Sequence, residues 1–306
     1  MWAGWFRLKP MTQGTRQKGT TSTGTASTGP PSVPLTVSST GTESDAAGQS
    51  GLASAAARRA VADAGTAVAA YLVAWASLGS TVLTGPAPWF LALAAGAAVI
   101  VRAAGSVLRR TPRFSTPADR VTLARAAIVA CCAAETVVGF MAGAAASSLV
   151  VLLGTAAFLL DAVDGRVARW TGSATAEGSR LDSDTDAALV LVLSCAAAGT
   201  FGLWPLGIGL MYYAFLAAAW FRPSLKNPLP SSTVRRIIGA TQPAALLFAL
   251  LPGVPPALGA MVLGAALGLL AFSFGRDVVE LERLRRAALN AAASSPASCA
   301  DTPAGT

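Results

Sequence analysis

The stretch from Ala126 to Gly165 reads AAIVACCAAETVVGFMAGAAASSLVVLLGTAAFLLDAVDG and contains neither lysine nor arginine. A membrane helix needs about 20 apolar residues to cross the hydrocarbon core, so a run of this length is enough for two helices and a tight turn. Gly143 lies near the middle of the run, where a turn is expected. The stretch therefore predicts a helical hairpin in a membrane.

Three other intervals that lack lysine and arginine have the same length and pattern: Ala60–Val101, Leu181–Phe221 and Ile237–Gly275. Each has turn residues near its middle, and arginine or lysine flanks every interval. The positive-inside rule places the flanks, and with them both termini, in the cytoplasm. We therefore expect an all-α integral membrane protein of the cell membrane, a polytopic helical bundle with eight transmembrane helices.

The composition supports a membrane protein and excludes several other classes. The chain is 53% hydrophobic and 12% charged, whereas soluble domains carry about a quarter charged residues. The net charge of +8 comes from arginines in small groups between apolar runs, which favours loops facing an anionic leaflet and no nucleic-acid partner. The absence of histidine excludes a Ser-His-Asp triad and histidine metal ligands.

Four segments follow from these patterns. Residues 1–60 are rich in Thr, Ser, Gly, Ala and Pro and predict a disordered N-terminal tail. Residues 61–104 predict two transmembrane helices, and residues 105–276 predict a domain of six more. Residues 277–306 predict a cytoplasmic amphipathic helix and a second tail.

Acidic residues at the cytoplasmic ends of two consecutive helices carry the chemistry. Asp161 and Asp164 share one helical face, and so do Asp182 and Asp186. Asp184 points away from the second pair and is interpreted as a solvated or capping residue. Four converging carboxylates repel one another unless a cation neutralises them, and an all-oxygen set suits Mg²⁺, Mn²⁺ or Ca²⁺. The alternative is that they are ordinary helix-end acids facing water.

The loop between these helices indicates a phosphate-bearing substrate. Its glycines, Gly165 and Gly178 among them, allow a ligand to approach the backbone closely. Arg169 provides a planar set of donors that can clamp phosphate oxygens opposite a metal ion.

The string from Asp161 to Arg169, DAVDGRVAR, is followed by Gly178, Asp182 and Asp186. This pattern resembles the signature D-x2-D-G-x2-A-R-x8-G-x3-D-x3-D of the CDP-alcohol phosphotransferase family, also called CDP-alcohol phosphatidyltransferases. The stretch from Pro117 to Thr122 is similar to the beginning of that family's first helix. The resemblance spans about Thr116–Gly275, so the predicted six-helix domain matches the family's core and residues 61–104 are two extra helices.

The resemblance implies roles for the matching positions. Asp161, Asp164, Asp182 and Asp186 would bind one or two ions of Mg²⁺ or Mn²⁺, and Asp186 would also be the general base for the acceptor hydroxyl. Other matching residues would contact or lie close to the CDP part of the substrate: Asp119, Thr122, Gly165, Ala168, Arg169, Thr175 and Gly178.

The implied reaction transfers a phosphatidyl or other substituted phosphate group to an acceptor alcohol and releases CMP, as in phospholipid biosynthesis. The expected partners are CDP-diacylglycerol or another CDP-alcohol, an acceptor alcohol and membrane lipid, and a homodimer stays open. The basic stretches Arg222–Lys226 and Thr233–Arg236 either hold a phosphorylated acceptor, such as glycerol 3-phosphate or an inositol phosphate, or are plain topology charges.

Two alternatives come from other classes. A cation-coupled transporter would carry its acids near mid-membrane and contain inverted repeats, whereas these acids lie at helix ends. A catalytically inactive family member that acts as a membrane binding or scaffold protein would be expected to lack one of the four signature aspartates, and none is missing.

Overall fold

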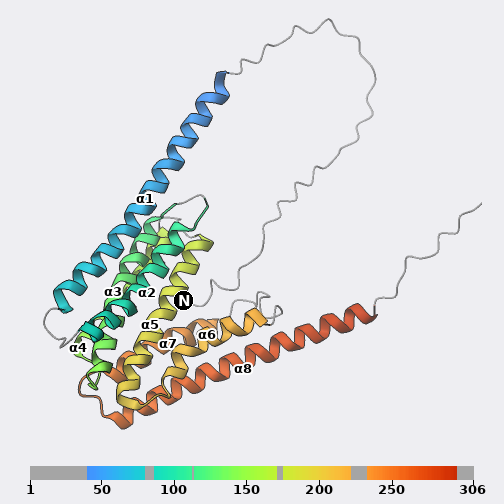
Figure 1. Ribbon diagram of the computed structural model, residues 1–306. Coiled ribbons are helices and arrows are strands. Elements are labelled where there is room, and N and C mark those ends of the chain that lie inside the picture. The colour runs from blue at the N-terminus through green and yellow to red at the C-terminus, as the bar shows by residue number, and fades with distance from the viewer. Residues whose placement is uncertain (1–39, 80–85, 112–113, 171–174, 222–232, 295–306) are drawn as a thin grey trace, which may run out of the picture.

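The computed structural model describes residues 40–79, 86–111, 114–170, 175–221 and 233–294, which form helices joined by short turns and contain no strand. In chain order and as labelled in Figure 1, the helices are α1 (Thr40–Gly79), α2 (Pro86–Leu108), α3 (Pro117–Met141), α4 (Ser148–Trp170), α5 (Ala176–Phe201), α6 (Leu206–Phe221), α7 (Thr233–Leu250) and α8 (Pro256–Ser294). The all-helical fold class predicted from the sequence is therefore confirmed for the described residues.

Helix α3 is the centre of the bundle. It packs against α1, α2, α4 and α5, and most of its surface is buried. α6 and α7 pack against α5, and α8 packs mainly against α7. The N-terminal part of α1 and the C-terminal part of α8 both extend well beyond the bundle (Figure 1). Among the five candidate membrane spans of the described residues, those of α3 and α5 have the largest buried shares.

Three glycines make the turns that the sequence predicted. Gly143, Gly202 and Gly253 have φ angles of 61°, 83° and 92°, and no other described residue has a positive φ. They join α3 to α4, α5 to α6 and α7 to α8. Because this left-handed region is strained for residues with a Cβ atom, glycine permits each reversal. Three predicted turns are thus confirmed, and the fourth, at residues 80–85, lies outside the described residues.

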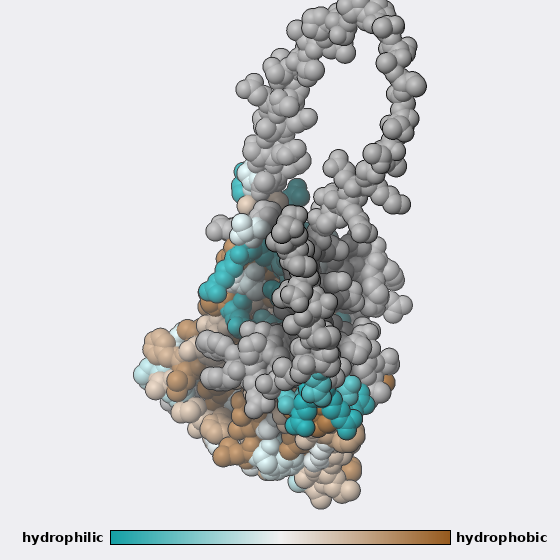
Figure 2. Space-filling model, turned by 90° about the vertical axis from the view of Figure 1, so that its right-hand side faces the viewer, coloured by the Kyte–Doolittle hydropathy of each residue, from teal (hydrophilic) through white to brown (hydrophobic). Residues whose placement is uncertain are grey.

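Five helices in the described part of the chain are long and apolar enough to cross a membrane: Ser54–Ser77, Pro86–Leu108, Pro117–Met141, Glu177–Phe201 and Pro256–Glu280. Ser148–Asp161 and Ile237–Leu250 are shorter apolar segments, and α6 has 16 residues, where a span needs about 20. Brown, hydrophobic residues dominate the lower part of the face in Figure 2. The protein is therefore a helical membrane protein, while the count of eight spans stays a prediction.

The predicted N-terminal tail is too long. α1 begins at Thr40, so the prediction of disorder up to residue 60 is wrong over its last part. The reason is local composition, because the segment from Ala53 to Ala64 is rich in alanine, the strongest helix former. Ala60 is fully buried, and Asp63 accepts a hydrogen bond of 2.9 Å from Arg120 on α3. At the other end, α8 continues through the predicted boundary at residue 277 as one helix.

The close contact at Gly96 joins the two extra helices to α3. Tyr71 on α1 donates a hydrogen bond of 2.8 Å to the Leu93 carbonyl on α2. Its ring lies against Gly96, where an added Cβ atom would also come within 2.5 Å of the Ala130 carbonyl oxygen on α3. Because the α3 backbone cannot shift without disturbing its helix, only glycine fits between the three helices.

We predict that Gly96→Ala lowers the thermal midpoint of the detergent-solubilised protein, because overpacking a core costs about 1–3 kcal/mol. Gly105→Ala is the matched control on the same helix, since a Cβ atom there meets nothing within 4 Å. It should leave the midpoint unchanged or raise it slightly. Equal midpoints for the two variants would contradict the packing assigned to Gly96.

Candidate active site

Three aspartates converge where the end of α4 meets the beginning of α5. Asp161 comes from α4, and Asp182 and Asp186 lie one turn apart on α5. One carboxylate oxygen from each residue can be chosen so that all three lie within 4.8 Å of one another. The structure therefore brings together three of the four aspartates in the signature, and the helical phase used to pair Asp182 with Asp186 is correct.

The three carboxylates differ in depth. The side chains of Asp161 and Asp182 are 21% and 30% exposed, whereas that of Asp186 is 9% exposed. Both carboxylate oxygens of Asp186 are buried and accept no hydrogen bond within the described structure. A buried carboxylate without hydrogen bonds is costly. Asp186 is thus the innermost acid and the one that most needs a ligand or a counter-charge.

Arg125 on α3 lies in the middle of this acid cluster. Its Nη1 donates to Asp161 Oδ1 at 2.5 Å, and its Nη2 donates to Asp182 Oδ1 at 2.5 Å. Nη2 also lies 3.3 Å from Asp186 Oδ1, where it forms an ion pair without hydrogen-bond geometry. Arg125 is 0% exposed. One guanidinium therefore contacts carboxylates on two other helices.

Sequence reasoning treated Arg125 only as one of the basic residues that flank an apolar interval. A signal was available, because Arg125 lies about two turns inside the helix that begins at Pro117. A charge at that depth in an apolar helix needs a partner. The partners themselves are 36 and 57 residues away in sequence, so the pattern could not name them.

Asp119 lies at the beginning of α3, and both of its carboxylate oxygens accept hydrogen bonds. It accepts two hydrogen bonds of 2.8 Å from Arg110, and it also accepts from the backbone N–H and the hydroxyl of Thr116. With the bond from Asp119 N to Thr116 Oγ1, these contacts form a capping box. Thr122, one turn further along, donates to the Ala118 carbonyl at 3.1 Å. Asp119 thus fixes the start of α3.

Thr175 and Gly178 bring the beginning of α5 against the beginning of α3. Thr175 is the N-cap of α5 and accepts a hydrogen bond of 3.0 Å from the backbone N–H of Gly178. A Cβ atom on Gly178 would lie 3.0 Å from Thr175 Oγ1 and 3.2 Å from Asp119 Oδ1. A side chain at this position of the signature would therefore crowd two predicted substrate-binding residues.

For other predicted site residues, the structure describes only the backbone or neither backbone nor side chain. The backbone of α4 runs through Asp164, Gly165, Ala168 and Arg169, but their side chains are outside the described residues. Asp164 follows Asp161 by three positions on the same helix, and the prediction that both share one face stays a prediction. The basic stretch Arg222–Lys226 also lies outside the described residues.

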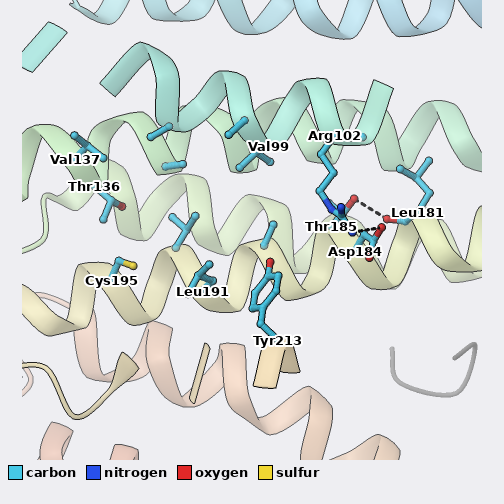
Figure 3. Close-up of a pocket in the computed structure, with 16 residues that line it drawn as sticks. Val99, Arg102, Thr136, Val137, Leu181, Asp184, Thr185, Leu191, Cys195 and Tyr213 are labelled. Atoms are coloured by element: carbon cyan, nitrogen blue, oxygen red, sulfur yellow. Dashed lines mark hydrogen bonds and ion pairs between the residues drawn. The ribbon is translucent and has the colours of Figure 1, made fainter. Parts of the chain in front are cut away.

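Asp184 points away from the cluster, as its helical phase predicted. Instead of being a freely solvated or capping residue, it is 21% exposed and paired with two other helices. It accepts a hydrogen bond of 3.0 Å from Arg102 on α2 (Figure 3). It also accepts one of 3.3 Å from Tyr212 on α6. Arg102 and Asp184 lie at one end of an apolar cavity of about 320 Å³ between α2, α3 and α5, with Tyr213 of α6 also lining it. Asp184 therefore connects helices outside the acid cluster.

The acid cluster has the chemistry of a site for a divalent cation. Arg125 can neutralise only one of the three negative charges that the described carboxylates carry when ionised. The remaining negative charge favours a hard cation, as do the Asp186 oxygens, which accept no hydrogen bond within the described residues. The all-oxygen donor set suits Mg²⁺ or Mn²⁺ better than zinc.

The comparisons with known proteins agree with this geometry. A family model described as CDP-alcohol phosphatidyltransferase matches residues 115–272, which is more than half of the chain. The match contains α3 to α7 and the first part of α8, and with them Arg125 and the whole acid cluster. Comparisons with curated proteins and with solved structures gave no match. The chain therefore belongs to the CDP-alcohol phosphatidyltransferase family.

Proposed function

We propose that this protein transfers a phosphatidyl or other substituted phosphate group from a CDP-alcohol, with CDP-diacylglycerol as the expected donor, to an acceptor alcohol in phospholipid biosynthesis. Family membership supports a phosphotransferase. The observation that carries the proposal is the convergence of Asp161, Asp182 and Asp186 within a helical membrane protein.

The aspartates of the cluster would hold one or two divalent ions, Mg²⁺ or Mn²⁺. Asp161, Asp182 and Asp186 supply the described oxygens, and the helical phase of α4 adds Asp164. Neither oxygen of Asp186 accepts a hydrogen bond within the described residues, which is an independent reason to expect a cation there. When bound, such an ion supplies positive charge that stabilises the pyrophosphate and the departing CMP.

Asp186 is the proposed general base. The acceptor oxygen forms a bond to the phosphorus that carries the lipid, and the bond from that phosphorus to the oxygen bridging it to CMP breaks. The proton of the acceptor hydroxyl passes to the Asp186 carboxylate, and CMP leaves with the bridging oxygen. Asp186 suits this role because it is the most enclosed acid of the cluster and its oxygens accept no hydrogen bond within the described residues.

The nucleotide is proposed to bind over the beginnings of α3 and α5. Thr175 and Gly178 lie there beside Asp119, with Thr122 one turn deeper. Gly165, Ala168 and Arg169 are proposed contacts on the last turns of α4, where the arginine would clamp phosphate oxygens. Since Arg110 and Thr116 already use both oxygens of Asp119, this residue would act mainly by fixing the α3 end of the site.

The proposed orientation places the active site and both termini in the cytoplasm. On a cysteine-free background, Ala144→Cys in the α3–α4 turn should react with a membrane-impermeant maleimide in intact cells. Thr111→Cys, between α2 and α3, should react only after the membrane is opened. Both positions are exposed in the structure. The reverse labelling pattern would overturn the orientation.

Activity should depend on a divalent cation. With CDP-diacylglycerol and a panel of alcohols, the purified protein should release CMP in Mg²⁺ or Mn²⁺, lose this activity in excess chelator and regain it when metal returns. The alcohol that supports release identifies the acceptor. Full activity in excess chelator would remove the metal from the proposed function.

Replacing aspartate by asparagine, which exchanges one carboxylate oxygen for an NH2 group, should affect CMP release differently at Asp186 and at Asp184. Asp186→Asn should reduce CMP release by about 10²–10⁴-fold or more, because it removes the general base. Asp184→Asn is the matched control on the same helix. Its amide oxygen can still accept from Arg102 while its NH2 group donates to the Tyr212 hydroxyl oxygen, so its rate should stay within a few-fold of the parent. An inactive scaffold protein would release no CMP in any variant, and an active Asp186→Asn would contradict the assignment of the base.

A further inference from the structure

Arg125 occupies a place that the proposed chemistry does not use. It is completely buried, and its two terminal nitrogens contact different helices, α4 through Asp161 and α5 through Asp182. We propose that Arg125 is a built-in counter-cation, which holds the acid cluster together without metal and competes with the divalent ion for the same carboxylates. The inference rests on the metal site of the proposed function.

The cluster needs a positive charge before any metal arrives. Asp161, Asp182 and Asp186 bring their oxygens within 4.8 Å of one another. In a poorly hydrated site such charges repel strongly, and an unpaired buried charge is among the most destabilising features of a fold. The Arg125 guanidinium reduces this repulsion from within the chain. The helices α3, α4 and α5 can therefore assemble in the metal-free protein.

The same contacts oppose metal binding. Arg125 takes one oxygen each of Asp161 and Asp182, which are two of the three residues that would hold the ion. A divalent ion in the cluster must displace Arg125 from these oxygens or share them with it, and it is repelled by the guanidinium beside it. Repulsion between like charges at such short separations inside a protein is large enough to measure as a change in metal affinity. Arg125 is thus a positioning residue that sets metal affinity.

The test is a Mn²⁺ titration of the purified full chain without substrate. Free Mn²⁺ is followed by its electron paramagnetic resonance signal, and the thermal midpoint is recorded with and without Mn²⁺. Arg125→Met should be less stable than the parent without metal. It should bind Mn²⁺ at least about tenfold more tightly, and Mn²⁺ should raise its midpoint by more than that of the parent.

Arg110→Met is the matched control. Arg110 is also buried, with its side chain 3% exposed, and it is paired with an aspartate of α3 outside the acid cluster. Its loss should lower stability to a similar extent because Asp119 is left unpaired. However, the affinity for Mn²⁺ and the rise in midpoint that Mn²⁺ causes should match those of the parent.

Arg125→Lys keeps the positive charge but has only one donor group to bridge the two helices. Its Mn²⁺ affinity should fall between those of the parent and Arg125→Met, and it remains informative if Arg125→Met cannot be purified. Parental or weaker Mn²⁺ affinity in both Arg125 variants would overturn the proposal, since Arg125 would then be a purely structural residue. Absence of Mn²⁺ binding in every variant would overturn it too. The proposed function is tested separately, by whether the parent protein releases CMP.

Discussion

The ion pairs of Arg125 with Asp161 and Asp182 are the constraint on which the site depends. They join the central helix, α3, to the two helices that carry the acids. Both hydrogen bonds of the guanidinium to these carboxylates are short, and Arg125 is fully buried. A buried ion pair contributes little net stability, but the loss of one partner is severe. The sequence of α3 therefore cannot change at this position without disturbing α4 and α5.

A second buried arginine fixes the same helix at its end. Arg110 and the Thr116 capping box hold Asp119, and Asp119 in turn contacts the position of Gly178 at the start of α5. Arg125 thus sets the rotation of α3 relative to the acids, while Asp119 sets where α3 begins. Together they fix the distance between the acid cluster and the proposed nucleotide contacts.

The two helices outside the family match, α1 and α2, are attached to this core by ordinary packing. The pairs Asp63–Arg120 and Arg102–Asp184 involve arginine side chains that are more than half exposed, so they contribute little. The contact at Gly96, where Tyr71 and the α3 backbone meet, is much tighter. The extra helices therefore enclose one side of α3 without contributing a side chain to the described acid cluster.

Features that depend on one helix or one turn follow from the residue pattern alone. The spacing of Asp182 and Asp186 fixed their common face because an α-helix repeats every 3.6 residues, and Gly143, Gly202 and Gly253 marked turns that require a positive φ. Which charged residues pair depends on how the helices pack. Arg125 pairs with Asp182, 57 residues away, and Arg102 pairs with Asp184, 82 residues away, because helix packing brings them together. Local periodicity contains no information about such distant partners.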